Sequence, residues 1–173
     1  MRIRVHSLAD VDQHFEQVRA AAAETQAWIA AHSGDPMALL RALKFETVGF
    51  HPIGGHALNV IEQINQTFTY AVALVAAREL LAWHPDVGGF DLAPGAHMAQ
   101  PLDIQSVVPG LVGAETFAAV DPRNNGKLAG DLTKLSACAH RYRYVFFATG
   151  HTVGTVRLPE FERDGIQVWS VHV

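Results

Sequence analysis

The sequence predicts a mixed α/β fold, in which a central β-hairpin is flanked by helices. Apolar residues recur at helical spacing from residue 58 to residue 83. Two runs rich in strand-forming residues, LDIQSVV and LVGAETFAAV, then follow on either side of Pro109-Gly110, a pair suited to a turn. A further helical segment and two apolar strand-like runs complete the chain. At 173 residues, the chain is expected to be a single domain with its own core.

The first 55 residues predict mainly helix. Residues Ser7 to Asp12 offer capping side chains for a long helix, which Gly34 and Pro36 are expected to end. A short helix, MALLRAL, follows, and the glycines and prolines of FETVGFHPIGGHAL then predict extended chain and loop. We therefore interpret residues 1–55 as an N-terminal helical extension of the domain.

The helix at residues 58–83 is expected to be the central one. Its apolar residues repeat every three or four positions and predict one buried face: Ile61, Ile64, Phe68, Val72 and Val75. Glu62 lies in a polar stripe beside that face. Such a stripe is usually a solvated flank, and the alternative is that Glu62 faces a functional site.

The segment after the hairpin predicts a helix and then strands. Residues 125–139 place Leu128, Leu132 and Leu135 on one face, behind a capping region at DPRNN. YRYVFFATG and IQVWSVHV are apolar enough for buried strands. The expected organisation is a core at residues 56–148 and a C-terminal strand region at residues 149–173.

The charge distribution limits the classes of partner. The formal net charge of -4 and the pI of about 6.2 exclude a uniformly basic coat for nucleic acid. Basic residues nevertheless gather between residues 123 and 143, where Asp131 is the one acid. Four of them are candidates for contact with phosphate: Arg123, Lys134, Arg141 and Arg143.

The compartment is inferred from the cysteine content and from the apolar runs. A single cysteine, Cys138, cannot form an internal disulfide, which favours a reducing compartment and thus the cytoplasm. The start of the chain lacks the apolar region of a signal peptide, and no run has the length of a membrane span. The chain is expected to have no membrane partner.

Two carboxylates in the hairpin, Asp103 and Glu115, are the leading candidates for chemistry. Paired carboxylates bind Mg²⁺ or Mn²⁺, since hard cations take oxygen ligands. Glu115 lies among residues fit for burial, and a buried carboxylate requires a metal or a polar partner such as a salt bridge. A two-residue loop at Pro109-Gly110 would put the two acids on opposite faces, whereas an odd-numbered loop or a bulge would pair them directly. The sequence leaves both registers open.

The order of elements and acids resembles the PD-(D/E)XK nuclease superfamily, which has a restriction-endonuclease-like fold. The resemblance covers roughly residues 56–148 and rests on the central helix bearing Glu62, the P-x-D motif ending at Asp103, and Glu115 on the next strand. It implies that Asp103 and Glu115 hold a divalent metal, with help from the carbonyl of Thr116 and from Glu62.

One position departs from the family motif. The lysine expected two residues after the glutamate is replaced by Phe117. Some members of the superfamily are thought to supply this lysine from the following helix, where Lys127 is the candidate. The alternative is that Lys127 belongs to a solvated helix flank.

Three functions follow as expectations. The first is a phosphodiesterase that uses Mg²⁺ or Mn²⁺ to cut DNA as an endonuclease, with Asp103, Glu115 and Lys127 as catalytic residues. The second is an inactive scaffold of the same fold, which binds nucleic acid or a protein partner, including a second copy of the chain. The acidic net charge and Phe117 favour that second function. The third is a metal-free small-molecule site beside the histidine-bearing loop HPIGGH, near His56.

Overall fold

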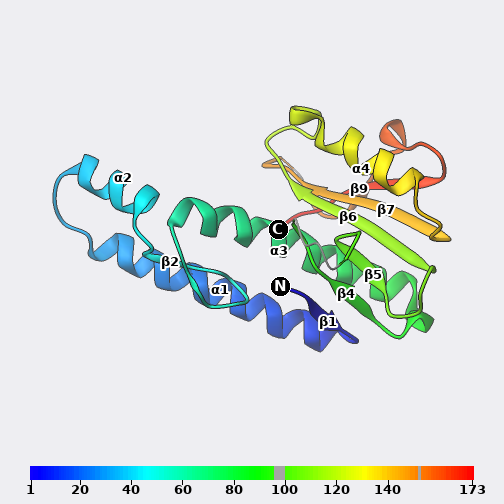
Figure 1. Cartoon of the computed structure of the whole chain (residues 1–173), viewed down its shortest axis with the longest axis horizontal. Coiled ribbons are helices and arrows are strands. Elements are labelled where there is room, and N and C mark those ends of the chain that lie inside the picture. Colours follow the sequence, from blue (N-terminus) through cyan, green and yellow to red (C-terminus); the bar gives the residue numbers. More distant parts are fainter. Residues whose placement is uncertain (96–99, 152) are drawn as a thin grey trace.

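In the computed structural model, which describes residues 1–95, 100–151 and 153–173, a seven-stranded mixed sheet is covered by helices on both faces (Figure 1). Its strands lie in the order β1 (Ile3–Val5), β4 (Phe90–Leu92), β5 (Ile104–Ser106), β6 (Val112–Ala118), β7 (Tyr142–Ala148), β9 (Ile166–Ser170) and β8 (Val156–Arg157). The helices are α1 (Leu8–Ala31), α2 (Pro36–Phe45), α3 (Val60–Trp83) and α4 (Lys127–Ser136), and β2 (Gly49–Phe50) and β3 (Ala57–Leu58) form a small separate sheet.

The predicted hairpin is present at the centre of the large sheet. Strands β1, β4, β5 and β6 are successively antiparallel, whereas β6, β7 and β9 are parallel. Helix α4 connects β6 to β7, as expected for the crossover that a parallel pair requires. The predictions of a mixed α/β sheet, of a central hairpin and of a crossover helix are confirmed.

The two faces of the sheet bury separate cores. Tyr144 and Phe146 of β7 belong to the core under α3, whereas Val145 and Phe147 belong to the core under α4. This alternation follows from the two-residue period of a strand. On α4, the predicted apolar face is confirmed, because Leu128, Leu132 and Leu135 are all buried in the second core. Side chains on β6 therefore face either α3 or α4.

The terminal regions take part in the same sheet. Within residues 1–55, β1 forms one edge of the large sheet and pairs with β4, and Arg2 and Arg4 form ion pairs with Asp91 of β4. Helix α1 packs along α3, where Thr25 donates to the buried Gln63. In the C-terminal region, β9 pairs with β7. The run IRV is too short to identify β1 as a sheet strand from its sequence alone.

The predicted buried face of the central helix is wrong for its first half. Ile61, Ile64 and Phe68 are exposed, while Val60 and Gln63 are buried. The reason is that this half of α3 packs against α1, α2 and β2, with the sheet beneath only its second half. Among the residues described, no helix combines the length and apolar character needed to span a bilayer, and this includes α3.

Candidate active site at the junction of β5, β6 and α4

Asp103 and Glu115 stand opposite each other in the hairpin. The antiparallel register pairs Ile104 with Ala114 and Gln105 with Gly113, so one further step brings Asp103 to Glu115. The connecting loop, residues 107–111, has an odd number of residues. This is the register that direct pairing of the two acids requires. The structure therefore brings the two predicted carboxylates together.

Just before β5 begins, the side-chain carboxylate of Asp103, in place of a backbone carbonyl, accepts a hydrogen bond from the backbone of β6. Its Oδ2 accepts hydrogen bonds from the backbone N–H of Thr116 at 2.9 Å and from the Thr116 hydroxyl at 3.1 Å. Because the N–H and C=O of one strand residue point toward the same neighbour, the carbonyl of Thr116 also points to this side of β6. Thr116 therefore holds Asp103 in place and leaves its carbonyl beside the acid.

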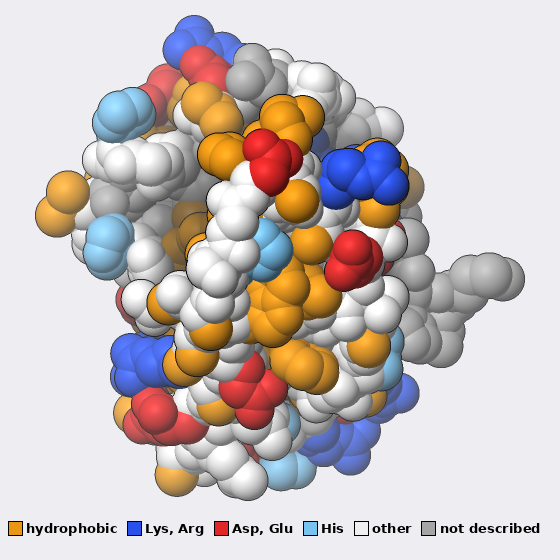
Figure 2. Space-filling view, turned by 90° about the vertical axis from the view of Figure 1, so that its left-hand side faces the viewer, with side chains coloured by type: hydrophobic (Ala, Val, Ile, Leu, Met, Phe, Trp, Pro, Cys, Tyr) orange, Lys and Arg blue, Asp and Glu red, His pale blue; other side chains and the backbone are white. Residues whose placement is uncertain are grey.

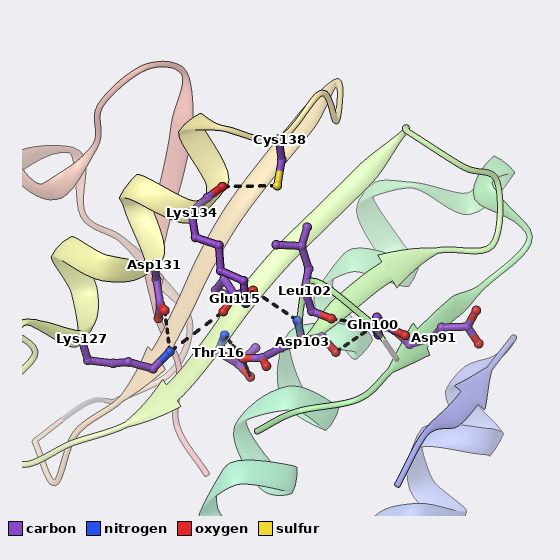
Figure 3. Close-up of polar contacts among 10 residues, drawn as sticks. All are labelled: Asp91, Gln100, Leu102, Asp103, Glu115, Thr116, Lys127, Asp131, Lys134 and Cys138. Atoms are coloured by element: carbon purple, nitrogen blue, oxygen red, sulfur yellow. Dashed lines mark hydrogen bonds and ion pairs between the residues drawn. The ribbon is translucent and has the colours of Figure 1, made fainter. Parts of the chain in front are cut away.

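Glu115 is the most deeply buried acid of the site, with 1% of its surface exposed. As Figure 3 shows, it points from β6 toward two lysines of α4. Its Oε1 lies 2.7 Å from Nζ of Lys134, and its Oε2 lies 4.0 Å from Nζ of Lys127. The same Oε1 accepts a longer hydrogen bond, at 3.3 Å, from the backbone N–H of Asp103. A salt bridge with α4 thus offsets part of the cost of burying this charge.

A third carboxylate, Asp131, joins the site from α4. It is 4% exposed and forms an ion pair with Lys127 one turn earlier. Its second oxygen, Oδ2, is buried and has no hydrogen-bond partner among the described residues. We call these five residues the carboxylate–lysine cluster: Asp103, Glu115, Lys127, Asp131 and Lys134. With every group ionised the cluster carries one more negative than positive charge.

Burial governs the ionisation of the cluster. Loss of water around Glu115 raises its pKa from 4.5 to about 7, with repulsion by Asp103 as the second cause. Burial also raises the pKa of Asp103 and that of Asp131, against the lowering effects of Thr116 and Lys127 respectively. Above about pH 7, where Glu115 loses its proton, the cluster therefore holds excess negative charge in a poorly solvated place, where a cation is stabilised.

The donor set suits a hard cation with few protein ligands. Mg²⁺ typically binds one or two carboxylates and keeps several waters, so Asp103 and Glu115 with the Thr116 carbonyl match its preference. In the part of the chain that the structure describes, no group of three or more acidic, histidine or cysteine side chains is arranged to hold a metal ion. The described donors at this point are therefore two carboxylates and a carbonyl, which are too few for a closed structural metal centre.

The position of the missing family lysine is filled by an aromatic ring. Phe117 stacks on Phe147 at 5.4 Å between ring centroids, and Nζ of Lys127 lies 5.9 Å from the Phe117 ring. Lys127 of α4 lies with its Nζ 4.0 Å from Oε2 of Glu115. Lys134 comes closer to Glu115, although the sequence suggested only a DNA contact for it. The sequence feature that could have identified Asp131 as a site residue is its position between two lysines on one face of the predicted helix.

Other predicted site residues lie apart from the cluster. Glu62 is exposed in the first turn of α3, on the face of the sheet opposite α4. Arg123 follows β6 and pairs with Asp121, whereas Arg141 precedes β7 and stacks on the Tyr142 ring. Because β6 and β7 are parallel, these two arginines lie at opposite ends of the sheet.

Arg143 has a local role in the fold. Its guanidinium donates to the backbone carbonyls of Leu135 and Asp164, which joins the end of α4 to the turn before β9. Together with the positions of Arg123 and Arg141, this means that the four predicted phosphate contacts do not form one continuous strip.

The histidine loop forms a local structural unit. His51 stacks on His56 at 4.7 Å between ring centroids, and Nδ1 of His51 accepts the backbone N–H groups of Ile53 and Gly54. His97 lies outside the described residues. A cleft of about 680 Å³ opens elsewhere, between α3 and the ends of β6 and β7, and His56 is not among its lining residues.

No family model, curated protein or solved structure matches the chain. The geometry of the carboxylate–lysine cluster therefore carries the functional proposal.

Proposed function

We propose that the chain is a divalent-metal-dependent phosphodiesterase that acts on DNA, with Asp103 and Glu115 as the ligands of Mg²⁺ or Mn²⁺. The observation that carries this proposal is the register of the hairpin, which sets Asp103 opposite Glu115 beside the Thr116 carbonyl. Two lysines from the crossover helix reach the same point. The mixed sheet, with its parallel pair β6 and β7, agrees with the nuclease resemblance in the order of its elements.

Each residue has a role that follows from its position. When bound, the ion supplies Lewis acidity and lowers the pKa of a coordinated water. Asp103 is held in place by Thr116, while Glu115 becomes available as a ligand when Lys134 releases it. Lys134 and Lys127 are then able to donate to the phosphate oxygens, where they stabilise the developing negative charge. Asp131 positions Lys127 through their ion pair.

The decisive experiment combines metal binding with cleavage. Calorimetry with Mn²⁺ should show binding in the native chain and its loss in Asp103→Asn and Glu115→Gln. Cleavage of supercoiled plasmid DNA should require Mn²⁺ or Mg²⁺ and should disappear in the same two variants. Glu24→Gln, which alters an exposed acid on α1, is the matched control and should change neither measurement. Mn²⁺ binding that survives Asp103→Asn would refute the site.

The inactive scaffold is the second candidate, and the burial of the cluster favours it. Asp103 and Glu115 are both buried, and Lys127 and Lys134 already pair with acids of the cluster. Ion pairs of this kind also stabilise buried charges in proteins where they have no catalytic role. On this alternative, DNA or a protein partner binds without any Mn²⁺ binding, and Asp103→Asn lowers stability without affecting that binding.

A further inference from the structure

The cleft of about 680 Å³ lies at the carboxyl ends of the parallel strands β6 and β7. Its walls come from the first half of α3, from residues 118–120 at the end of β6, from residues 148–151 at the end of β7, and from residues 172 and 173. Ligands of α/β sheets commonly bind outside the carboxyl ends of parallel strands. The location is therefore that of a binding site, on the α3 side of the sheet.

The walls of the cleft are largely apolar, with polar side chains at Asn65, Thr69, Thr149, His151 and His172. Phe68 is 46% exposed and Val120 is 86% exposed, and Ile64 is exposed beside them. Figure 2 looks onto the end of the molecule that carries α2 in Figure 1, where apolar side chains lie among charged and histidine side chains. Among the described lining residues, none is Asp, Glu, Lys or Arg. Asn65 and Thr69 add polar groups to the α3 wall.

This lining selects one kind of ligand. A phosphate or carboxylate would find no lysine or arginine among the described lining residues, whose basic side chains are the histidines His151 and His172. A flat group with apolar faces and hydrogen-bonding edges matches an exposed phenyl ring beside an amide side chain. Nucleobases have this chemistry, and stacking on one aromatic ring contributes about 1–3 kcal/mol per base.

The cleft and the carboxylate–lysine cluster lie on opposite faces of the sheet, and the segment that follows β6 joins the two faces. Ala118, which lines the cleft, follows Glu115 by three residues on the same strand, which corresponds to about 10 Å. Arg123 and Lys127 lie on the segment that continues from the rim of the cleft to α4. A DNA segment that passes around the carboxyl end of β6, with its phosphates against Arg123 and Lys127, can place a neighbouring base in the cleft. In a duplex the bases are stacked and paired, so such a base must be unpaired.

We propose that this cleft binds an unpaired nucleobase of a single-stranded DNA segment, with Phe68 as the stacking surface. The inference rests on the proposed function, because the nearby cluster is the reason for choosing a nucleotide as the ligand. It adds the substrate class: DNA with single-stranded character next to the bond that is cut.

The test measures DNA binding without metal, so that it is independent of cleavage. Fluorescence anisotropy in EDTA follows a labelled single strand of about ten nucleotides, the same sequence as a duplex, and an abasic strand of equal length. The native chain should bind the single strand most tightly. Phe68→Ala should weaken that binding about five- to 100-fold, to the level of the abasic strand.

Phe45→Ala is the matched control, because Phe45 is 73% exposed on α2 and does not line the cleft. It should leave the affinity unchanged. Val120→Asp, at the exposed rim, adds a negative charge without disturbing the core and should also weaken binding. Equal effects of Phe68→Ala and Phe45→Ala, or none from either cleft variant, would overturn the inference. A dimer of the native chain in sedimentation that Phe68→Ala dissociates would also overturn the inference. In that case the cleft would be an interface between copies of the chain.

The outcomes separate this inference from the proposed function. If the native chain neither binds Mn²⁺ nor cuts DNA, yet Phe68 governs single-strand binding, the phosphodiesterase proposal fails and the base site stands. If Mn²⁺-dependent cleavage depends on Asp103 but both cleft variants bind and cut as the native chain does, the phosphodiesterase proposal stands and the base site fails.

Discussion

Nζ of Lys134 lies 2.7 Å from Oε1 of Glu115, closer than Nζ of Lys127, which is 4.0 Å from Oε2 of the same residue. The main ion pair of the buried glutamate is therefore made from the second half of α4, seven residues beyond the lysine that the family resemblance selected. Seven residues are about two helical turns, so both lysines project from the same side of the helix.

Lys134→Ala is expected to destabilise the fold more than Lys127→Ala. Without Lys134 the buried Glu115 loses its nearest positive charge, so its pKa rises further and the free energy of unfolding at about pH 8 falls by about 1–2 kcal/mol. The cost is smaller than for a fully buried pair, since Lys134 is half-exposed. Urea unfolding provides the measurement. Lys44→Ala, an exposed lysine of α2, should change stability by less than about 0.5 kcal/mol.

Glu115 should make the fold less stable as the pH rises. Its pKa is 4.5 in the unfolded chain and about 7 in the folded one, so the folded state holds the extra proton between these values. Below 4.5 the carboxyl is neutral in both states and has no effect. Above about pH 7 the carboxyl is ionised in both states, and its burial lowers the free energy of unfolding by at most about 3 kcal/mol.

The comparison with Glu115→Gln isolates this effect. His51, His84 and His140 have pKa values lowered by burial, and their loss of protons increases stability as the pH rises. These contributions cancel in the difference between the native chain and Glu115→Gln. We expect the free energy of unfolding of the native chain to fall relative to that of Glu115→Gln between about pH 5 and about pH 8. Chemical denaturation at each pH provides the measurement. A difference independent of pH would contradict the raised pKa.

Two glycine substitutions should have opposite effects. A Cβ on Gly113 would lie 2.5 Å from Cδ1 of Leu102 and 3.0 Å from the His140 ring, so Gly113→Ala should cost about 1–3 kcal/mol and disturb Asp103 next to Leu102. A Cβ on Gly130 of α4 meets no atom within 4 Å, so Gly130→Ala should stabilise the fold by about 0.5–1 kcal/mol through helix propensity. Thermal unfolding of both variants measures whether each substitution lowers or raises the stability of the fold.

The elements of the fold were largely predictable from local patterns, whereas the site depended on long-range geometry. The period of Leu128, Leu132 and Leu135 identified α4 and its buried face. The register of Asp103 with Glu115 required the length of the loop at residues 107–111, which Pro109-Gly110 alone does not fix. For Ile64 and Phe68, helical spacing marked an apolar face correctly but could not show that the sheet ends before reaching them.

The roles of Asp131 and Lys134 could not be predicted from the sequence for a related reason. Lys127, Asp131 and Lys134 follow one another at intervals of four and three residues, which is also the pattern of a solvated helix flank. Only the packing of α4 over β6 turns this flank toward Glu115. A pattern within one helix cannot distinguish the two outcomes, because the distinction lies in what covers the helix.

Mn²⁺ binding should release protons in a manner set by Glu115. A carboxylate must be ionised to serve as a ligand, and the pKa of Glu115 is raised to about 7 in the folded chain. At about pH 6 most molecules hold this proton, so binding should release close to one proton, while at about pH 8 release should approach zero. The apparent affinity should accordingly rise by about tenfold from pH 6 to pH 7.5 and then level off.

Calorimetry in two buffers of different ionisation enthalpy measures this release directly. Glu24→Gln, the exposed control, should reproduce the native proton count. Lys134→Ala should increase the release near pH 7, because without its ion pair Glu115 holds its proton to higher pH. Binding that is tight at pH 6 and releases no proton would mean that Glu115 is not a ligand. The ion would then have to lie where Asp103 alone reaches it, and the pairing of the two acids would serve the stability of the hairpin alone.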